Sequence, residues 1–599
     1  MGGGARQGRA RQASPHMLTV RAEPDGAGRE RPVPEAGQRL THEVVNQVPP
    51  LAGYDVASDP PLLEALQREG AGWAIPQVRE LGRLAGLAQT QEQARLANQN
   101  PPLLRTHDRC GHRIDEVEFH PAWHRLMATA VSNGLHAAPW TEPPAAGAHL
   151  ARAAGFYVWT QAEAGHGCPI SMTYASVPAL RRAPDLAAVF EPLLGARAYD
   201  PGLRAPEQKS GLLAGMAMTE KQGGSDVRAN TTAAAPAGDG SYLVTGHKWF
   251  CSAPMCDLFL LLAQGPAGLS CFLLPRVLPD GTRNAMRLQR LKDKLGNRSN
   301  ASAEVEYDAA RAWPVGEPGR GTATIIEMVS ATRLDCVLGS AAQIRQACVA
   351  AVHHAAFRSA FGRYLIDQPL MAGVLADLTI ESEAATSLAM RLAAASDRAA
   401  RGDTAEAALL RVALPAAKFW VCKRAPAVTA EALECLGGNG YVEESGLPRL
   451  YRDAPLNSIW EGSGNVTALD VIRALRRSPE ALDALLTETD RAAGGGRRLD
   501  QAVALLRSEL KKAAAATEAA AHYRARRLAG LMTVVLQAAL LVRHAPAAVS
   551  DAFCAAKLDP AAGGDAAGAL GPAVPFGGLP DGIDLAAVLT RSQSVVPSR

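Results

Sequence analysis

Apolar residues recur along this 599-residue chain at two different spacings, and the changes between them divide the sequence. Over residues 60–98, in segments such as LLEALQREG, apolar side chains return every three or four residues, which predicts amphipathic helices. The run NQNPP at 98–102 ends this pattern, and a second helical stretch extends from 120 to about 206. We therefore expect a large N-terminal helical domain over residues 41–215.

The middle of the chain has shorter apolar runs, which are bounded by Gly, Pro or Asp. These runs occupy residues 212–218, 242–245, 249–252, 258–263 and 270–274. Runs of this length with such boundaries are typical of β-strands. We expect a compact β domain over residues 216–318.

The helical spacing returns after residue 319, in alanine-rich stretches at 340–360, 373–400 and 410–436 and a shorter one at 466–475. This pattern predicts a helical domain over residues 319–477, followed by a basic helical domain over 478–560. Residues 1–40 are expected to form a disordered tail, and the Ala/Gly/Pro-rich residues 561–599 a poorly ordered one. The predicted fold class is mainly α with a central β domain.

The composition limits the functions that this arrangement can serve. The net charge is only +3, so any affinity for nucleic acid requires a local basic patch. The ten cysteines form no C-x-x-C pair and no Cys/His cluster at zinc spacing, which predicts buried free thiols, no metal site and a cytoplasmic location. No apolar run reaches the roughly 18 residues that span a bilayer, so no membrane segment is expected.

One acidic residue, Glu461, lies in the segment RLYRDAPLNSIWEGSGNVTAL at 449–469, between Trp460 and the small residues 462–464. Glycines let the backbone approach a ligand closely, and a carboxylate beside an apolar ring is a candidate for a raised pKa. A raised pKa suits a general base that removes a proton from carbon near neutral pH. The alternative is a surface loop that carries an ordinary solvated glutamate.

A second candidate is the segment TEKQGGSD at 219–226, which has two adjacent glycines and hydroxyls at Thr219 and Ser225. At the end of a strand, such a loop can cradle a phosphate or the polar edge of a heterocycle. It is not a Walker loop, because no G-K-[ST] follows, and it lacks G-x-G-x-x-G. The alternative is a plain β-turn.

A third candidate is the segment GHKWFCS at 246–252, in which a tryptophan within a strand is followed by a hydroxyl. An aromatic wall beside a hydrogen-bonding group suits a flat redox ring. The alternative places Trp249 in the hydrophobic core.

These features together resemble the acyl-CoA dehydrogenase family: the helix–β–helix order, a T-E-x-x-G-G-S-D loop, a K-W-x-x-S strand and a late E-G-S. The resemblance covers about residues 101–475 and is specific because the separated motifs follow the family order. It implies an N-terminal helical domain, a β-barrel-like middle domain and a C-terminal four-helix bundle. The basic helical domain is then an addition to the family fold.

Within this family the chain is most similar to the AidB-like subgroup of alkylation-response flavoproteins. The segments that carry the similarity are MTEKQGGSDV (218–227), LKDKLGNRSNAS (291–302), ECLGGNGYVEES (434–445), NSIWEGSGN (457–465) and FHPAWH (119–124). The similarity implies noncovalently held FAD, an acyl-CoA-like substrate, a homotetramer built as a dimer of dimers and an electron-transfer flavoprotein as electron acceptor.

The resemblance also implies roles for individual residues. Glu461 falls at the position of the catalytic base, which takes the α-proton of an acyl thioester while the β-hydrogen leaves as hydride to flavin N5. Thr219 would hydrogen-bond the flavin pyrimidine edge, and Ser252 would lie near N5. The full cofactor set implied is Met216, Ala217, Met218, Thr219, Glu220, Lys221, Gln222, Gly223, Gly224, Ser225, Trp249, Phe250, Cys251, Ser252, Arg358, Phe361, Gln368, Gly437, Gly438, Ile459, Trp460, Gly462, Ser463 and Asn465.

Two parts of this set would act between subunits. The segment from Arg358 to Gln368 resembles the one through which a family member touches its neighbour's FAD. Gly437 and Gly438 resemble the contact on the adenine side of that neighbour's cofactor. We therefore expect these residues to complete a site on another copy of the chain.

Two residues depart from the pattern. Trp460 stands where most of the family has a tyrosine, and its larger ring is expected to crowd the acyl pocket and weaken turnover of ordinary acyl-CoA. Cys251 replaces the phenylalanine of the AidB-like sequences, which removes an aromatic ring from the expected flavin surround.

The basic C-terminal region supports a second hypothesis, a flavoprotein that binds double-stranded DNA and protects it from alkylation. Residues 473–543 carry thirteen Lys and Arg against seven Asp and Glu, and phosphate contacts of this kind are salt-dependent and indifferent to sequence. The predicted contacts are Arg476, Arg477, Arg497, Arg498, Arg524, Arg526 and Arg527. The alternatives are a solvated helix face and a helical scaffold with a vestigial flavin.

Overall fold

The structure is a computed structural model that describes residues 1–2, 41–141, 145–558 and 576–593. The chain divides into two units, residues 1–47 and residues 48–599. In the first unit the described residues contain no helix or strand, and residues 3–40 of the expected disordered tail lie outside the description. The rest of the fold concerns the second unit.

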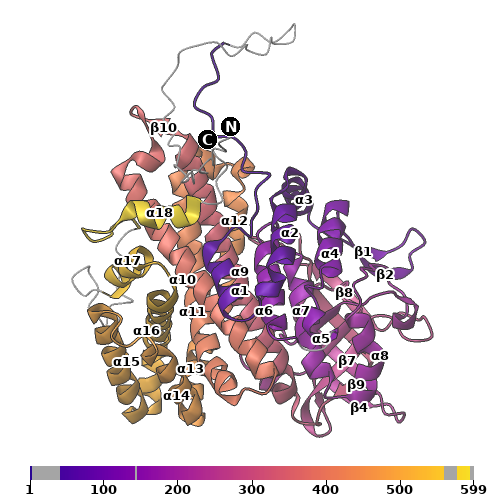
Figure 1. Cartoon of the computed structure of the whole chain (residues 1–599). Helices are drawn as coiled ribbons and strands as arrows, with labels where there is room; N and C mark the ends of the chain where they lie inside the picture. Colours follow the sequence, from indigo (N-terminus) through magenta and orange to yellow (C-terminus); the bar gives the residue numbers. More distant parts are fainter. Residues whose placement is uncertain (3–40, 142–144, 559–575, 594–599) are drawn as a thin grey trace. The chain divides into compact units, whose positions relative to one another are not determined.

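Residues 60–194 are mainly helical, as the apolar spacing predicted (Figure 1). The helices are α1 (Pro60–Arg68), α2 (Ile75–Gly86), α3 (Ala88–Gln99), α4 (Pro121–Ser132), α5 (Ala138–Thr141), α6 (Ala148–Trp159), α7 (Gly167–Leu180) and α8 (Pro184–Leu194). An antiparallel hairpin of β1 (Leu103–His107) and β2 (Arg113–Glu118), which the apolar spacing did not predict, lies between α3 and α4. Its strands are only five and six residues long, LLRTH and RIDEVE, and show no regular alternation of apolar and polar residues that would stand out between helices.

The middle of the chain forms a seven-stranded, barrel-like sheet. Its strands are β3 (Ala214–Ala217), β4 (Ala233–Pro236), β5 (Tyr242–Ser252), β6 (Leu258–Gly265), β7 (Gly268–Pro275), β8 (Met286–Leu291) and β9 (Ser302–Val315). The order is β3-β6-β4-β5-β9-β7, and β7 also pairs with β6, which closes the ring. Closure leaves β4, β5, β6, β7 and β9 without a free edge, whereas β3 pairs only with β6 and β8 only with β9. The β domain expected from the sequence is confirmed.

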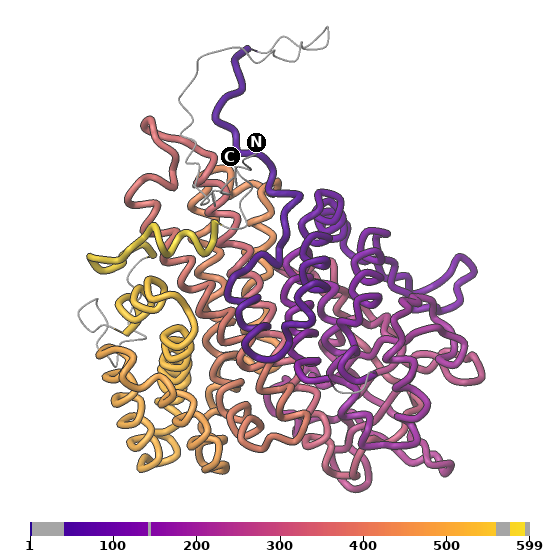
Figure 2. The backbone as a smooth tube through the Cα atoms, viewed as in Figure 1, coloured from indigo at the N-terminus to yellow at the C-terminus, as the bar shows by residue number. Residues whose placement is uncertain are grey.

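Three long helices follow: α9 (Gly321–Phe357), α10 (Pro369–Ala400) and α11 (Thr404–Cys435). They run side by side, with α13 (Gly464–Arg477) against α11 (Figure 2). Helix α9 is buried on nearly every face, because α7 of the N-terminal helical region packs against it as well as α10 and α11. Its many alanines and glycine permit this close packing. A short helix, α12 (Leu447–Asp453), precedes the loop that leads into α13.

The C-terminal region adds α14 (Pro479–Asp490), α15 (Arg497–Ala515), α16 (Glu518–His544) and α17 (Ala547–Leu558). Helix α16 packs against α10, α11 and α13, so this region rests directly on the preceding helices. Among the described residues α16 is the one helix that is long and apolar enough, by length and composition alone, to cross a membrane. Since 83% of its most apolar window is buried inside the protein, a core helix accounts for its composition.

The end of the chain differs from the predicted poorly ordered tail. Residues 585–593 form helix α18 (Leu585–Gln593), which packs against α10 and is seen in yellow across it in Figure 1. Arg591 fixes this helix through ion pairs with Glu64 on α1, 2.7 Å, and Glu383 on α10, 2.6 Å. The remaining residues of the predicted tail, 561–575 and 594–599, lie outside the described residues.

All ten cysteines are free, and nine of them are buried, with Cys110 exposed. Within the described residues no group of three or more His, Cys, Asp or Glu side chains could hold a metal ion.

Candidate functional site

Glu461 lies in a five-residue loop, residues 459–463, between the 3₁₀ turn Ala454–Ser458 and α13; we call it the Glu461 loop. Its backbone has φ 56°, a left-handed conformation that costs a non-glycine residue about 1 kcal/mol or more, so the surroundings must hold it. The Thr332 hydroxyl on α9 donates to Glu461 Oε2 at 2.7 Å. The side chain is therefore fixed and points toward α9.

Burial raises the pKa of Glu461 above its ordinary value, although the Thr332 hydrogen bond and the charges of Lys418 and Arg333 oppose the shift. Desolvation disfavours a carboxylate, and it outweighs the two nearby cations here. This is the direction that a base working near neutral pH requires. By surface area Glu461 is partly buried, and its carboxylate is held by Thr332, so it is not a freely solvated loop side chain.

Two cations hold the backbone of the Glu461 loop. Lys418, 1% exposed on α11, donates to the carbonyl oxygens of Trp460, at 2.7 Å, and of Gly462. Arg333 on α9 donates to the Glu461 carbonyl oxygen at 3.0 Å and pairs with Asp470 on α13 at 2.7 Å. These contacts satisfy three consecutive carbonyl groups, which the strained backbone would otherwise leave unpaired.

Thr332, Arg333 and Lys418 were not predicted from the sequence. A signal existed for Lys418, because a lysine within the apolar run LPAAKFW has to be paired if the helix is buried. No sequence signal connects the other two to residue 461, since the loop meets α9 only through the tertiary fold.

The segment 216–225 and strand β5 lie together, as the two flavin motifs predicted. The Trp249 backbone N–H donates to the Thr219 carbonyl oxygen at 2.8 Å, and the Lys221 N–H donates to His247 Nε2 at 3.0 Å. The register of β5 against β9 shifts between Lys248 and Cys251, which turns Trp249 and Phe250 outward together. Phe250 is 53% exposed, and Trp249 lies outside the core, contrary to the core alternative.

Some residues of this segment can reach a ligand only through their backbone. The Glu220 side chain is fully buried in an ion pair with Lys248, 2.9 Å, and also accepts from the Thr231 and Thr232 N–H groups. Cys251 is 0% exposed in the core, and burial raises the pKa of its thiol to about 12. The Cys251 side chain therefore faces the core and not the surface that Trp249 and Phe250 form.

Cys168, at the start of α7, connects Ser252 with Glu461. Burial raises the pKa of its thiol to about 12; the Lys294 charge lowers this pKa, the Glu461 charge raises it, and the polar side chains of Asn300 and Ser252 lower it. Ser252 Oγ is 3.4 Å from Ser302 Oγ, which lies 3.2 Å from Lys294 Nζ. The fold thus brings the end of β5, the start of α7 and the Glu461 loop to one place, although they are distant in sequence.

A second group of predicted residues lies at the other end of α9. Arg358 follows this helix, Phe361 is 99% exposed at the tip of a hairpin of β10 (Ser359–Ala360) and β11 (Arg363–Tyr364), and Gly437 and Gly438 have no neighbour within 4 Å of a built Cβ. At 1.5 Å per residue, Thr332 and Arg358 are separated by roughly 39 Å along α9. Within one chain this group cannot share a small site with Glu461.

The predicted DNA-contacting arginines are spread over three helices. Arg476 and Arg477 end α13, Arg497 and Arg498 begin α15, and the other three belong to α16. All are exposed except Arg498, which is partly buried. Arg526 Nη1 donates to Asn465 Oδ1 at 2.8 Å, so this arginine also contacts the residue predicted to bind the cofactor after the base.

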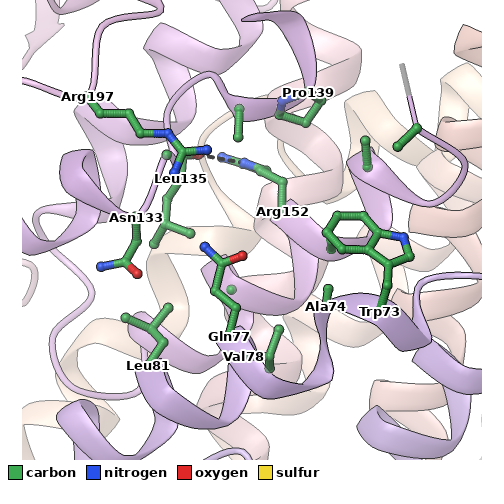
Figure 3. A pocket seen from close by; sticks show the side chains of 16 residues that line it. Trp73, Ala74, Gln77, Val78, Leu81, Asn133, Leu135, Pro139, Arg152 and Arg197 are labelled. Atoms are coloured by element: carbon green, nitrogen blue, oxygen red, sulfur yellow. Dashed lines mark hydrogen bonds between the residues drawn. The ribbon is translucent and has the colours of Figure 1, made fainter. Parts of the chain in front are cut away.

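A cavity of about 90 Å³ lies among α2, α4, α5 and α6, away from these groups (Figure 3). None of the predicted site residues lines it. The Arg152 guanidinium at its wall is already engaged by Asp335, 2.9 Å, and by the Leu135 carbonyl oxygen, 2.7 Å. Its walls are otherwise mainly apolar.

Known proteins share both the sequence and the fold of this chain. Three family descriptions match it in order: "Adaptive response protein AidB N-terminal domain" over residues 46–201, "Acyl-CoA dehydrogenase, middle domain" over 215–310 and "Acyl-CoA dehydrogenase, C-terminal domain" over 319–476. The Escherichia coli (strain K12) acyl-CoA dehydrogenase homologue AidB is 50% identical to this chain over 479 residues, which are 79% of this chain and 88% of that protein.

Two solved structures extend the comparison. The crystal structure of Caenorhabditis elegans ACDH-11 in complex with C11-CoA has a TM-score of 0.78 at 25% identity and covers 94% of this chain and 95% of that one. An acyl-CoA dehydrogenase from Bacillus anthracis complexed with FAD shares the fold, with a TM-score of 0.62 at 17% identity over 80% of this chain and 87% of that one. These structures share the fold of the chain, and the sequence matches above show that it belongs to the acyl-CoA dehydrogenase family, in its AidB-like branch.

Proposed function

We propose that this protein is an FAD-dependent dehydrogenase that introduces an α,β double bond into a short or branched acyl thioester, with Glu461 as the base. The observation that carries the proposal is the Glu461 carboxylate itself: its pKa is raised by burial and it is held by Thr332 beside Ser252 and Cys168. Membership of the acyl-CoA dehydrogenase family supports the reaction class.

The surface formed by Trp249, Phe250 and the 216–225 segment fits FAD. Two outward-facing aromatic rings lie beside a loop in which Gly223 has φ 133° and no atom within 4 Å of a built Cβ, so backbone there is open to a flat ligand. When bound, FAD supplies the hydride acceptor. The protein residues orient the thioester, accept its α-proton at a Glu461 carboxylate oxygen and exclude water.

The Trp460 side chain supports a restriction on the substrate. Its indole Nε1 donates to Asn457 Oδ1 at 2.9 Å. The Asn457 side chain is itself fixed, because its Nδ2 donates to Ser340 Oγ at 3.1 Å. A large ring that is fixed next to the base leaves less room for a long straight acyl chain. We therefore propose a short or branched acyl group and slow turnover.

Anaerobic mixing with a series of acyl-CoA thioesters tests the proposal through bleaching of the flavin absorbance. Glu461→Gln should slow bleaching by roughly 10² to 10⁴-fold, because general-base catalysis contributes about that much. The matched control is Glu444→Gln, an exposed carboxylate outside the site that should leave the rate unchanged. If no thioester bleaches the flavin, or Glu461→Gln bleaches it equally fast, the proposal fails.

We also propose that the chain forms a homotetramer in which the second residue group completes a neighbour's flavin site. The roughly 39 Å between Thr332 and Arg358 supports this, because that group lies too far from its own Glu461. Exposed apolar side chains near it also support an interface: Phe361 at 99%, Leu370 at 88% and Tyr441 at 82%.

Sedimentation of the holoprotein tests the assembly. Phe361→Asp with Leu370→Asp should produce smaller species that lose FAD, whereas Tyr523→Asp, 91% exposed on α16, should leave the tetramer intact. A wild-type protein that sediments as a monomer with full FAD content would exclude the shared site.

For electron transfer, we propose an electron-transfer flavoprotein as the acceptor, with the protein in the cytoplasm. Three cations surround the Trp249 ring: Lys292 Nζ lies 3.4 Å from its centroid, Lys221 Nζ 5.6 Å and Arg290 Cζ 5.9 Å. A positive rim around a partly exposed ring favours an acidic redox partner. Reoxidation of the bleached flavin by such a partner should weaken with salt, and salt-independent reoxidation would contradict the proposed docking.

A second candidate function is binding of double-stranded DNA without sequence preference, as a protective flavoprotein. Its support is the exposure of Arg477, Arg497, Arg524 and Arg527 on α13, α15 and α16. Arg527→Glu should weaken retention on duplex DNA at low salt and reduce the salt dependence by about one ion. The same reversal at Arg109, between β1 and β2, serves as the control, and equal effects of both changes would contradict the assignment.

A further inference from the structure

The start of α13 is wedged between two helices of different origin. On one side, a Cβ built on Gly464 would lie 2.6 Å from Lys423 Cε of α11, so the backbone approaches α11 closely. On the other side lies α16, whose Arg526 reaches Asn465 with a 2.8 Å hydrogen bond. Asn465 is the second residue of α13 and follows the Glu461 loop by two positions.

Arg526 is placed to hold one geometry. Its guanidinium lies over the Phe419 ring of α11, 5.5 Å from the centroid. This contact restricts the orientation of the guanidinium group that donates to Asn465. Lys423 faces the same ring at 5.8 Å, and burial first and the Arg526 charge second lower the pKa of Lys423. The guanidinium is thus kept close to a second cation by the packing of α16 on α11 and α13.

Two cations anchor the Glu461 loop and a third anchors the start of α13 that follows it, and the three differ in origin. Arg333 and Lys418 belong to α9 and α11, within the residues that match the acyl-CoA dehydrogenase C-terminal domain, 319–476. Arg526 belongs to α16, beyond that match. The added C-terminal region therefore reaches the segment that carries the proposed base.

We infer that Arg526 is a positioning residue for the Glu461 loop, so that the added C-terminal helices form part of the support of the active site. The inference rests on the proposed function of Glu461. Arg526 acts through Asn465 and the start of α13, which is continuous with the loop, and it touches neither the carboxylate nor its partner Thr332. Its loss frees the end of a loop whose backbone is held in a left-handed conformation.

Hydrogen exchange of the holoprotein tests the inference without reference to catalysis. Arg526→Gln should accelerate exchange of the amides of residues 459–466 about tenfold, and Arg526→Lys should restore part of the protection. The matched control is Lys511→Gln, which removes one exposed cation from α15 and should leave these amides unchanged. Unchanged exchange in Arg526→Gln, with a thermal midpoint equal to wild type, would overturn the inference.

The rate of flavin reduction by an acyl thioester provides the second readout. Arg526→Gln should reduce it about tenfold at saturating thioester, with the half-saturating concentration unchanged, because a small misplacement of a base affects the reaction and not binding. In an Asn465→Ala background the same change should have no further effect. Additive losses in the double variant would overturn the route through Asn465.

The two readouts separate the inference from the proposed function. If Arg526→Gln accelerates exchange in the loop while no thioester reduces the flavin, the positioning role holds and the proposed reaction fails. If thioesters reduce the flavin and Glu461→Gln abolishes this, yet Arg526→Gln changes neither exchange nor rate, the proposed function holds and the inference fails.

Discussion

Lysines and arginines are arranged differently around α9–α11 and on the C-terminal helices. Around α9–α11 several of them are buried with defined acceptors, such as Arg333, whose side chain is 8% exposed, and Arg391, whose side chain is 5% exposed, whereas Arg411 on α11 is 41% exposed. On α15 and α16 the side chains of Arg507, Lys512 and Arg524 are 42%, 55% and 44% exposed. The same residue types therefore fix backbone and helices in one region and face solvent in the other.

The difference shows how far a count of charges can mislead. Thirteen cations against seven acids suggested a large free positive charge in the C-terminal region. Several of these cations are committed within the structure: Arg491 and Arg543 to Glu488, Arg507 to Asp490, Lys512 to Glu509 and Arg526 to Asn465. The surface available to a polyanion is smaller than the sequence indicates.

The largest effect is expected from a buried cation that joins the two regions. Arg391 on α10 pairs with Glu406, 2.8 Å, and with Glu488 of α14, 3.0 Å. Arg391→Met should lower the free energy of unfolding by about 3–5 kcal/mol, because it leaves two buried carboxylates short of a partner. Thermal unfolding measures the loss, and Arg507→Met, whose pair with Asp490 is exposed, should cost less than about 1 kcal/mol. Equal losses would remove the distinction.

Acid should weaken the same junction. Burial alone would raise the pKa of Glu488, but Arg391, Arg491 and Arg543 outweigh it and lower the pKa to about 2 from 4.5. A depressed carboxyl pKa stabilises the fold above about pH 4.5, and this contribution, about 3 kcal/mol, is lost as the pH falls toward 2. The gap in thermal midpoint between wild type and Glu488→Gln should be wide at pH 7 and narrow at pH 3; a constant gap would contradict the ion pairing.

Lys418 should affect the reaction more than the fold around it. Lys418→Met leaves the Trp460 and Gly462 carbonyls unpaired and should slow flavin reduction about 100-fold through the loosened Glu461 loop. Because Lys418 lowers the pKa of Glu461, its removal should also move the acid limb of the pH–rate profile to higher pH. A profile that moves to lower pH, or a rate equal to wild type, would contradict the assigned role.

The smallest effect is expected at an exposed cation. Arg524→Gln removes a side chain that is 4.0 Å from Glu509 and should change the free energy of unfolding by less than about 0.5 kcal/mol. The salt dependence of DNA retention should nevertheless fall by about one ion. A clear loss of stability would place Arg524 with the buried cations instead.

Periodicity predicted the elements well where one kind of residue faces one environment, as in α9, α10 and α11. It failed in β5, which was predicted as two short strands because polar residues at 246–248 interrupt the apolar pattern. Lys248 is fully buried there and paired with Glu220, so this polar residue occupies an interior position of the sheet. Strand β9 was missed for a related reason, since its charged residues alternate with buried ones on a half-exposed sheet.

The candidate site divides in the same way. Glu461, Trp249 and the 219–226 segment could be found because each lies in a short motif with its own chemistry. Thr332 and Lys418 could not, because their role depends on α9 and α11 meeting the loop in space. The left-handed backbone of Glu461 was equally hidden, since nothing in the sequence reports a φ of 56° at a residue other than glycine.

The ion pair between Arg591 and Glu64 spans 527 residues of sequence. At a synthesis rate of roughly 5–20 residues per second, the interval between synthesis of α1 and synthesis of α18 is about half a minute to two minutes. During that interval the surfaces that α18 covers on α9 and α10 are open to chaperones or to other nascent chains. A chain that ends early, or carries a bulky fusion after α18, would leave the ribosome with this closing contact incomplete.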